Sequence, residues 1–164
     1  MPLYSSYHPD AERFVTEYIG TGHVMELLGW GIDGVVFAHP LVSNAIKVHK
    51  NQESFEKELA AYKRLSDRRV EKFMGFSVPQ LMGHDRQLRV VELSIVKPPF
   101  LLDFAAATVD KKNDFSPEDM ELWWQDVEHN FGDDYAIARD VFWGLKTDFG
   151  IYYWDLKPRN LCFR

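Results

Sequence analysis

Four short segments stand in a fixed order along this chain of 164 residues, and together they constrain its fold more than its composition does. A glycine-rich segment covers residues 28–36, and a strand-like run around Lys47 follows it. A helical pattern that carries Glu58 comes next, and a polar turn occupies residues 154–160 near the end of the sequence. The set predicts a site to which strands, a helix and a distant turn all contribute.

The composition is that of a packed, soluble protein. Apolar residues make up 46% of the chain and aromatic residues 15%, which is enough for a buried core. The net charge of −6 argues against a nucleic-acid-binding surface, which needs a basic patch. The single cysteine, Cys162, excludes an internal disulfide and a cysteine-based zinc site. No apolar run reaches the ~18–20 residues of a membrane span, and no signal pattern is visible, so we expect a cytoplasmic protein.

The first half of the sequence has the pattern of a small β-rich unit. Apolar runs and turn-forming residues predict strands at 23–28, 35–38, 44–48, 78–82 and 87–96, of which the last two are separated by 83–85. A short helix is expected at 11–19. Between residues 52 and 66 the period changes, and a stripe with helical spacing forms from Phe55, Leu59, Tyr62 and Leu65.

The second half is predicted to be helical. Ser116 caps a helix that Pro117 begins, and its apolar stripe consists of Met120, Trp123, Trp124, Val127 and Phe131. A further helix starts near Asp133 or Asp134, with a stripe of Ala138, Val141, Phe142, Leu145 and Phe149. Two consecutive prolines at 98–99 prevent the last expected strand from continuing. We therefore expect an α+β chain with a β-rich domain at 1–97 and a helical domain at 98–164.

The glycine-rich segment has two interpretations. Gly29, Gly31 and Gly34 fit the pattern G-x-G-x-x-G, and Val36 completes its longer form. Glycines let backbone amides approach phosphate oxygens, and they permit positive φ in a tight hairpin. A Rossmann-type dinucleotide site shares the pattern, but it requires a helix directly after the last glycine. Residues 35–40 are strand-like instead, so a hairpin is the preferred interpretation.

Lys47 is expected on the inner face of a strand, together with Ala45 and His49. A buried lysine is costly without a partner, and Glu58 on the following helix is the expected one. Glu56 competes for this role, but it lies about 200° around the helix from Glu58. The alternative is a solvated lysine on an edge strand.

Asp155 and Asn160 stand five residues apart in a turn that also holds Lys157 and Pro158. Such a turn presents Asp155 as a base toward a hydroxyl, Lys157 toward a transferred phosphate and Asn160 toward Mg²⁺. The alternative, an ordinary polar turn, does not explain why the two upstream motifs precede it in this order.

The motifs resemble, in order and in type, those of the protein kinase-like superfamily over residues 23–163, and residues 153–160 resemble the Ser/Thr-type catalytic loop H-R-D-L-K-P-x-N. The resemblance implies a kinase-like N-lobe, made of a five-stranded antiparallel sheet and one helix, and a shortened, mainly helical C-lobe. It also implies ATP and Mg²⁺ as cofactors. The roles implied are phosphate covering by Gly29, Gly31 and Gly34, phosphate binding by Lys47, anchoring of Lys47 by Glu58, base catalysis by Asp155 and metal binding by Asn160.

The adenine and ribose subsites follow from the same resemblance. Residues 100–104 resemble the segment after the kinase hinge. This implies that the stretch from Ser94 to Val96 lines the adenine pocket and that Asp103 touches the ribose.

Three departures from the kinase pattern affect the expected function. Tyr153 and Trp154 replace the histidine and arginine of the catalytic loop, and extra residues occupy 108–115. No Asp-Phe-Gly follows the loop; the tripeptide at 148–150 precedes it, and we interpret that as a coincidence. With Asn160 as the only expected metal ligand, we expect weak metal dependence and slow or absent turnover.

Two functions are consistent with the sequence. One is a kinase-like ATP-binding protein with weak phosphotransferase activity on a hydroxyl of a protein or small molecule. The alternative is a catalytically inactive kinase-like interaction module, a pseudokinase-type scaffold. A shortened helical half is expected to leave aromatic surface uncovered, so we expect a homo-oligomer or a protein partner, and neither a nucleic acid nor a membrane. The six histidines show no ligand spacing, and no role is assigned to them.

Overall fold

The chain folds around a five-stranded antiparallel sheet in the computed structural model, which describes residues 8–18 and 20–164. The strands lie in the order β1 (Leu27–Trp30), β2 (Gly34–Ala38), β3 (Asn44–His49), β7 (Val90–Ser94) and β6 (Leu81–Asp85). Every neighbouring pair is antiparallel. The fold is α+β, and the predicted five-stranded sheet is confirmed.

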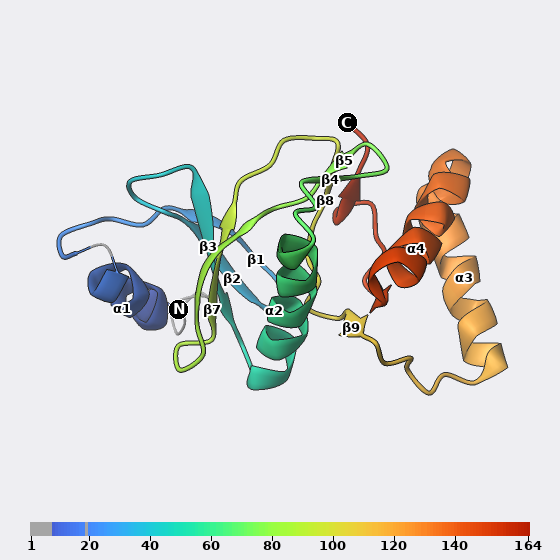
Figure 1. Cartoon of the computed structure of the whole chain (residues 1–164), viewed down its shortest axis with the longest axis horizontal. Coiled ribbons are helices and arrows are strands. Elements are labelled where there is room, and N and C mark those ends of the chain that lie inside the picture. The colour runs from blue at the N-terminus through green and yellow to red at the C-terminus, as the bar shows by residue number, and fades with distance from the viewer. Residues whose placement is uncertain (1–7, 19) are drawn as a thin grey trace.

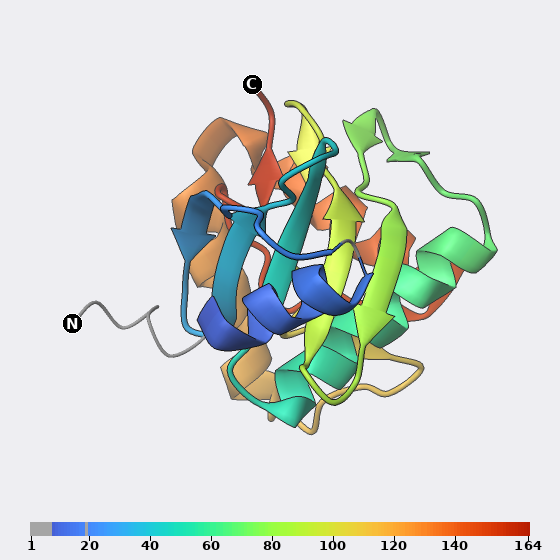
Figure 2. The same cartoon turned by 90° about the vertical axis from the view of Figure 1, so that its left-hand side faces the viewer.

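Two helices cover opposite faces of the sheet (Figures 1 and 2). α1 (His8–Tyr18) buries Phe14 and Val15 in a small core with the strand residues Ile46 and Val48. The sequence predicts this helix at 11–19, and residue 19 lies outside the described residues. The α1 side of β3 is therefore apolar.

α2 (Gln52–Asp67) packs on the other face of the sheet. Asn51 caps it by accepting a hydrogen bond from the Ser54 amide at 2.9 Å. The predicted stripe is buried, and it consists of Phe55, Leu59, Tyr62 and Leu65. Side chains alternate along a strand, so Lys47 and His49 of β3 face α2.

The structure corrects the predicted boundary between the last two strands of the sheet. Residues 83–85 lie inside β6, and the turn comes at 86–89. The side chain of Asp85 accepts a hydrogen bond from the Leu88 amide at 2.8 Å, and Arg89 has a positive φ of 53°. These two features close the hairpin later than the glycine at position 83 suggests. The first expected strand also begins later, at Leu27.

Several two-residue strands escaped prediction because they are too short to show a period. β4 (Lys72–Phe73) and β5 (Phe76–Ser77) form a hairpin. The others are β8 (Phe100–Leu101), β9 (Thr108–Val109), β10 (Ile151–Tyr152) and β11 (Leu161–Cys162).

The pairing of these short strands places residues 98–109 against the polar turn near the C-terminus. β8 pairs with β11, which directly follows the turn, and β9 pairs with β10, which directly precedes it. Both pairings are antiparallel. The two flanks of the turn are thus held by one upstream segment.

The two long helices of the second half confirm the prediction. α3 (Pro117–Phe131) is capped by Ser116, and α4 (Tyr135–Phe149) follows a 3₁₀ turn, η2 (Gly132–Asp134). Gly150 ends α4 in the left-handed conformation, with φ of 68°. The tripeptide Asp-Phe-Gly at 148–150 therefore forms the C-terminal end of α4. This position is consistent with the interpretation that its match to the kinase motif is a coincidence.

The aromatic side chains of α3 and α4 are better covered than the sequence analysis expects. Rings pack on one another, as Trp123 does on Trp124 and Phe142. No member of the following set is exposed: Trp123, Trp124, Phe131, Phe142 and Phe149. The large apolar side chains that remain exposed on these helices are Leu122, Ile137 and Trp143. An oligomer or partner on this surface stays a prediction.

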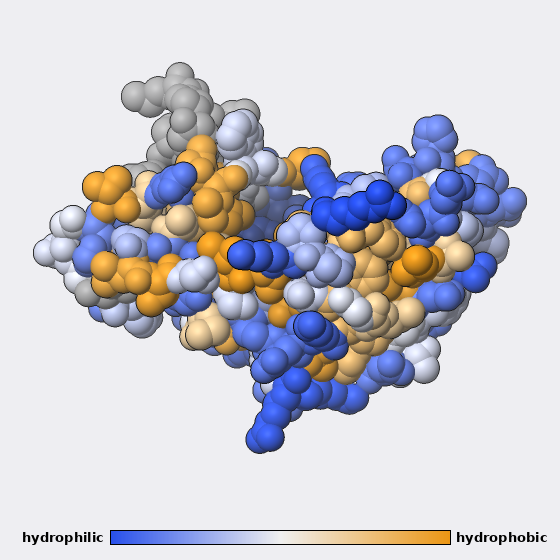
Figure 3. Space-filling model, turned by 90° about the horizontal axis from the view of Figure 1, so that it is seen from above, coloured by the Kyte–Doolittle hydropathy of each residue, from blue (hydrophilic) through white to orange (hydrophobic). Residues whose placement is uncertain are grey.

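One core runs through both halves of the molecule. It contains α2 residues such as Leu59 together with α3 and α4 residues such as Val127 and Phe142. The division at residue 97 stays a prediction, since this core crosses it. Seen from above, hydrophobic residues gather over the sheet half, and hydrophilic residues dominate the far end of the helical half (Figure 3). Within 8–18 and 20–164, no helix combines the length and the apolar character that crossing a membrane requires.

Candidate functional site

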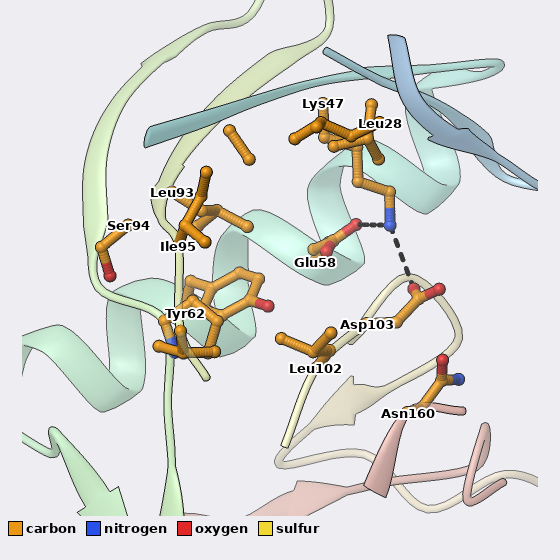
Figure 4. A pocket seen from close by; sticks show the side chains of 14 residues that line it. Leu28, Lys47, Glu58, Tyr62, Leu93, Ser94, Ile95, Leu102, Asp103 and Asn160 are labelled. Carbon is orange, nitrogen blue, oxygen red and sulfur yellow. Dashed lines mark hydrogen bonds and ion pairs between the residues drawn. The ribbon is translucent and has the colours of Figure 1, made fainter. Parts of the chain in front are cut away.

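Lys47 lies at the centre of a buried charge cluster on the α2 side of β3. Its Nζ lies 2.6 Å from Oε2 of Glu58 on α2 and 3.0 Å from Oδ1 of Asp103 (Figure 4). Burial of the ammonium works to lower the pKa of Lys47, but Glu58 and Asp103 outweigh it and raise the pKa. The predicted pairing with Glu58 is present, and Glu56 instead pairs with Arg86 at the surface.

Glu58 has a second partner on the same strand. Nε2 of His49 lies 2.5 Å from the same Oε2 atom, and both side chains are buried. Burial works to raise the pKa of Glu58, but Lys47 and His49 outweigh it and lower the pKa to about 2. Glu58 is therefore a carboxylate over the whole physiological pH range. Side chains alternate along a strand, and this places His49 on the same side as Lys47. That pattern could have indicated the contact with Glu58 from the sequence, although no role was assigned to the histidine.

Two adjoining cavities meet at Lys47. The first, of about 270 Å³, has a mostly apolar lining made by Leu28, Val36, Ala45, Tyr62, Pro79, Leu93, Ile95, Val96 and Leu102, together with Ser94, Lys47, Glu58, Asp103 and Asn160. The second, of about 200 Å³, is lined by the glycine-rich segment, residues 29–34, together with Val36, Lys47, Asp103, Arg159 and Asn160. Both cavities share Val36, Lys47, Asp103 and Asn160. The site has one apolar and one polar compartment.

The three glycines differ in their surroundings. A Cβ at Gly29 or Gly31 would meet no atom within 4 Å, whereas a Cβ at Gly34 would collide with the backbone carbonyl of Val48. None of the three has the positive φ that the sequence analysis allows for. Gly29 and Gly31 leave the hairpin open on the cavity side, and Gly34 is required for close pairing of β2 with β3.

Asp103 occupies a strained turn between β8 and β9. Its φ is 60°, a conformation that aspartate tolerates better than most residues. Oδ1 accepts the Lys47 hydrogen bond, and in Figure 4 the other carboxylate oxygen points away from Lys47. The side chain is 27% exposed. Asp103 is among the residues that line both cavities.

The turn at 155–160 is joined to the Asp103 segment by backbone and side-chain contacts. The Leu102 amide donates to the Asn160 carbonyl at 2.7 Å, and the hydroxyl of Tyr153 donates to the Leu102 carbonyl. Tyr153 is fully buried, and burial raises its pKa well above the usual value. Tyr153 thus fixes Leu102, the residue next to Asp103.

Asp155 and Asn160 form a pair inside the turn. Nδ2 of Asn160 donates to Oδ2 of Asp155 at 2.7 Å and to the Asp155 carbonyl at 3.0 Å. The amide nitrogen is therefore used within the turn, and the amide oxygen points toward Asp103 (Figure 4). Lys157 Nζ lies 2.5 Å from the other carboxylate oxygen of Asp155. Asp155 and Lys157 are not among the described residues that line the two cavities.

Asp33 adds a carboxylate from the tip of the glycine-rich segment. Partial burial raises its pKa, and the negative charge of Asp103 raises it further. An acid at this position makes the polar compartment more negative. The lining of this compartment thus holds two acids, Asp33 and Asp103, and two basic residues, Lys47 and Arg159.

Most of the predicted site residues surround the two cavities. Gly29, Gly31 and Gly34 line the polar compartment; Val36, Lys47, Glu58, Ser94, Val96, Asp103 and Asn160 line the apolar one. The residues that the sequence analysis missed are His49, Asp33 and Tyr62. Helical spacing identified Tyr62 as core, and only the fold reveals that it also reaches the cavity.

No protein-family model and no curated protein matches the sequence. Two solved structures, a streptomycin–ATP–APH(2'')-IIa ternary complex and a gentamicin–APH(2'')-IIa complex, align with part of the backbone.

The two alignments are partial. The ternary complex with streptomycin and ATP aligns over 59% of this chain and 30% of its own, with 16% identity and a TM-score of 0.40. The complex with gentamicin aligns over 90% of this chain and 52% of its own, with 11% identity and a TM-score of 0.42. This chain thus spans about half of that length or less. Both TM-scores lie below 0.5.

Proposed function

We propose that this chain binds ATP together with Mg²⁺ and transfers a phosphoryl group to a hydroxyl of a protein or small molecule. The observation that carries the proposal is the position of Lys47. Its ammonium lies between two carboxylates, where an apolar cavity meets a glycine-lined polar cavity. A flat apolar base and a charged phosphate chain need these two compartments side by side.

The apolar compartment supports binding of the adenine. Its walls include Leu28, Val36 and Ala45 on the sheet and Leu102 on the opposite side. The chain leaves β7 after Ser94 and runs along the cavity to Val96. Backbone groups of this stretch can meet the polar edge of a purine, which gives Ser94 and Val96 the role that the sequence analysis expects.

The polar compartment supports binding of the phosphates. Gly29 and Gly31 leave room for phosphate oxygens to approach the backbone. The Lys47 ammonium can turn from Asp103 to a phosphate while it remains paired with Glu58. Asp103 is thereby assigned to the phosphate end of the nucleotide and not to the ribose.

The donor set at Asp103 and Asn160 fits Mg²⁺. Within the described part of the chain, no three acidic, histidine or cysteine side chains gather closely enough to hold a metal by themselves. Mg²⁺ commonly takes one or two protein oxygens and completes its coordination with phosphates and water. Asp103 offers a carboxylate oxygen and Asn160 its amide oxygen, and bound Mg²⁺ would neutralise charge on the β- and γ-phosphates.

Asp103 thus supplies the acid that the sequence analysis expects to be absent. Kinases carry this acid after the asparagine of the corresponding turn. Here the segment that pairs with both flanks of the 155–160 turn precedes the turn in the sequence. We therefore expect ATP binding to depend strongly on Mg²⁺, whereas the sequence alone predicts a weak dependence.

The proposal is tested by isothermal titration of ATP into the protein with and without Mg²⁺. Asp103→Asn removes one charge and keeps the side-chain shape, and Asp110→Asn is the matched control. Asp110 also has a positive φ, of 57°, lies seven residues further along, and pairs with Arg64 at the surface. Asparagine tolerates this conformation as well as aspartate does.

We expect Mg²⁺ to strengthen ATP binding at least tenfold in the parent and in Asp110→Asn, and to have little effect in Asp103→Asn. Equal Mg²⁺ dependence in all three proteins would remove Asp103 from the metal site. If the parent does not bind ATP under either condition, the pseudokinase-type scaffold becomes the better interpretation.

A further inference from the structure

His49 is a fully buried histidine that takes no direct part in the proposed reaction. It lies at the end of β3, two residues after Lys47 and on the same side of the strand. Its Nε2 lies 2.5 Å from Oε2 of Glu58, and its Nδ1 lies 3.1 Å from the backbone carbonyl oxygen of Arg89. The ring of Phe55 packs against it edge-on, with centroids 5.6 Å apart. Both ring nitrogens are therefore fixed in place.

Both nitrogens of His49 face hydrogen-bond acceptors. The Arg89 carbonyl has no hydrogen to donate, and Glu58 is ionised because its pKa is held near 2. A neutral imidazole carries one N–H and can satisfy only one of these two oxygens. The imidazolium carries two, and it satisfies both.

The charges around Glu58 balance when His49 is a cation. The ionisable groups that face the pair are Lys47 on the same strand, Tyr62 on α2, Asp103 on the turn after β8 and Asp33 on the glycine-rich segment. Arg89, from the β6–β7 turn, reaches the backbone carbonyl of His49 with its Nε at 3.3 Å. Lys47 and His49 together then offset Glu58 and Asp103.

We propose that His49 is a positioning residue that keeps Glu58 ionised and in place while Lys47 turns toward the phosphates. This inference rests on the proposed function. Glu58 is only 1% exposed, so a loss of its compensating charge is costly. When Lys47 shares its hydrogens with a phosphate, His49 continues to donate to Glu58, and α2 remains at its distance from β3.

The inference is tested with ¹⁵N-histidine NMR and with nucleotide titration. His49→Gln keeps a hydrogen-bond donor near Glu58 but cannot titrate. His84→Gln is the matched control, because His84 is a partly exposed histidine on β6 of the same sheet. The His49 ring signal is assigned by its absence from the His49→Gln spectrum.

The NMR measurement does not depend on nucleotide. We expect both ring nitrogens of His49 to carry protons at pH 7, and one of these protons to be lost in the Glu58→Gln variant. A His49 ring with a single proton in the parent at pH 7 would overturn the inference, whether or not the protein binds ATP. If His49→Gln does not fold, the comparison of the parent with Glu58→Gln still decides the point.

The titration separates positioning from a purely structural role. We measure the affinity for ATP with Mg²⁺ at pH 7 in the parent, His49→Gln and His84→Gln. His49→Gln replaces a hydrogen bond from a charged donor with one from a neutral donor, so we expect it to bind ATP about tenfold more weakly than the parent and His84→Gln. Equal ATP affinity in the parent and His49→Gln would show that His49 contributes only to the fold. Failure of the parent to bind ATP would contradict the proposed function and leave the NMR result standing.

Discussion

The carboxylate of Asp103 lies 3.0 Å from the ammonium of Lys47, although 56 residues separate them in the sequence. The contact exists because β8 and β9 pair with the strands on either side of the 155–160 turn. The segment between β8 and β9 is thereby brought below the glycine-rich hairpin. A carboxylate that precedes the turn in the sequence thus occupies the place next to Asn160.

Replacement of Lys47 by alanine tests the centre of the site. Lys47→Ala removes the cation that Glu58 and Asp103 share, so we expect ATP binding to weaken at least tenfold. The fold should persist because His49 still compensates Glu58, with a loss of stability no larger than the ~3–5 kcal/mol typical of a broken buried pair. The measurements are ATP titration and urea unfolding. Lys57→Ala, which breaks an exposed pair with Glu53, serves as the control and should change neither quantity noticeably. Equal ATP affinity in Lys47→Ala and the parent would mean that the cavity has been misinterpreted.

We expect the three glycines of the hairpin to have two different roles: Gly34 contributes to stability, and Gly29 and Gly31 contribute to ATP binding. Gly34→Ala forces a methyl group onto the Val48 carbonyl, so we expect a loss of several kcal/mol in urea unfolding. Gly29→Ala and Gly31→Ala meet open space and should leave stability within about 1 kcal/mol of the parent. Their effect should appear in ATP affinity instead, because the methyl group projects into phosphate space. A stable Gly34→Ala protein would contradict the close pairing of β2 with β3.

We expect the free energy of unfolding to fall at low pH, because Glu58 becomes protonated there. Its pKa is near 2 in the folded protein against 4.5 as the ordinary value. A carboxyl with a lowered pKa contributes stability above its unfolded pKa, and this contribution is lost as the pH falls from about 4.5 through about 2. Glu58→Gln has no such carboxyl, so the stability difference between the parent and Glu58→Gln should narrow over this window. Urea unfolding at pH 6, 4 and 2.5 measures it. Glu53→Gln, at an exposed site, is the control, and a difference that stays constant with pH would show that folding does not lower the pKa of Glu58.

We expect the hydroxyl of Tyr153 to contribute to the stability of the fold in addition to the packing of its ring. Its hydroxyl donates to the Leu102 carbonyl, and Tyr153→Phe leaves that oxygen without its donor. The expected cost is about 1–3 kcal/mol, with a smaller effect of Mg²⁺ on ATP binding because the neighbouring Asp103 is held less firmly. Urea unfolding and ATP titration measure the two effects. Tyr152→Phe, at a half-buried ring that stacks on Trp154, is the matched control and should change neither by much. A Tyr153→Phe protein with unchanged stability and unchanged Mg²⁺ dependence would show that the Tyr153 hydroxyl does not hold the Asp103 turn in place.

The sequence predicts the parts of this fold that depend on local periodicity. The α2 stripe, the Ser116 cap and the partnership of Lys47 with Glu58 follow from spacing of three, four or two residues. The two-residue strands β8 to β11 carry no such pattern, because their pairing is decided by contacts across about sixty and about forty residues. The contact between Asp103 and Lys47 was accordingly not predicted from the sequence. His49 was overlooked for another reason: its partners are an acid nine residues away and a backbone carbonyl, and neither makes a ligand motif.

Catalysis should depend on Asp155. A general base contributes typically 10²–10⁴-fold to a reaction rate, and Asp155 is the carboxylate next to Asn160 that can accept a proton from a hydroxyl. In the present structure one of its oxygens is paired with Lys157, which can turn to the transferred phosphate and free that oxygen for the acceptor.

With Asp103 and Asn160 both available to Mg²⁺, we expect the parent to release ADP from ATP in the presence of a generic hydroxyl acceptor. Asp155→Ala should lower that rate at least a hundredfold and leave ATP affinity within a few-fold of the parent. Asp148→Ala is the control, because it removes the exposed acid of the tripeptide at 148–150 and should leave the rate unchanged. Equal rates for the parent and Asp155→Ala would exclude Asp155 as the base. A parent that binds ATP with Mg²⁺ but releases no ADP would support the inactive, pseudokinase-type alternative.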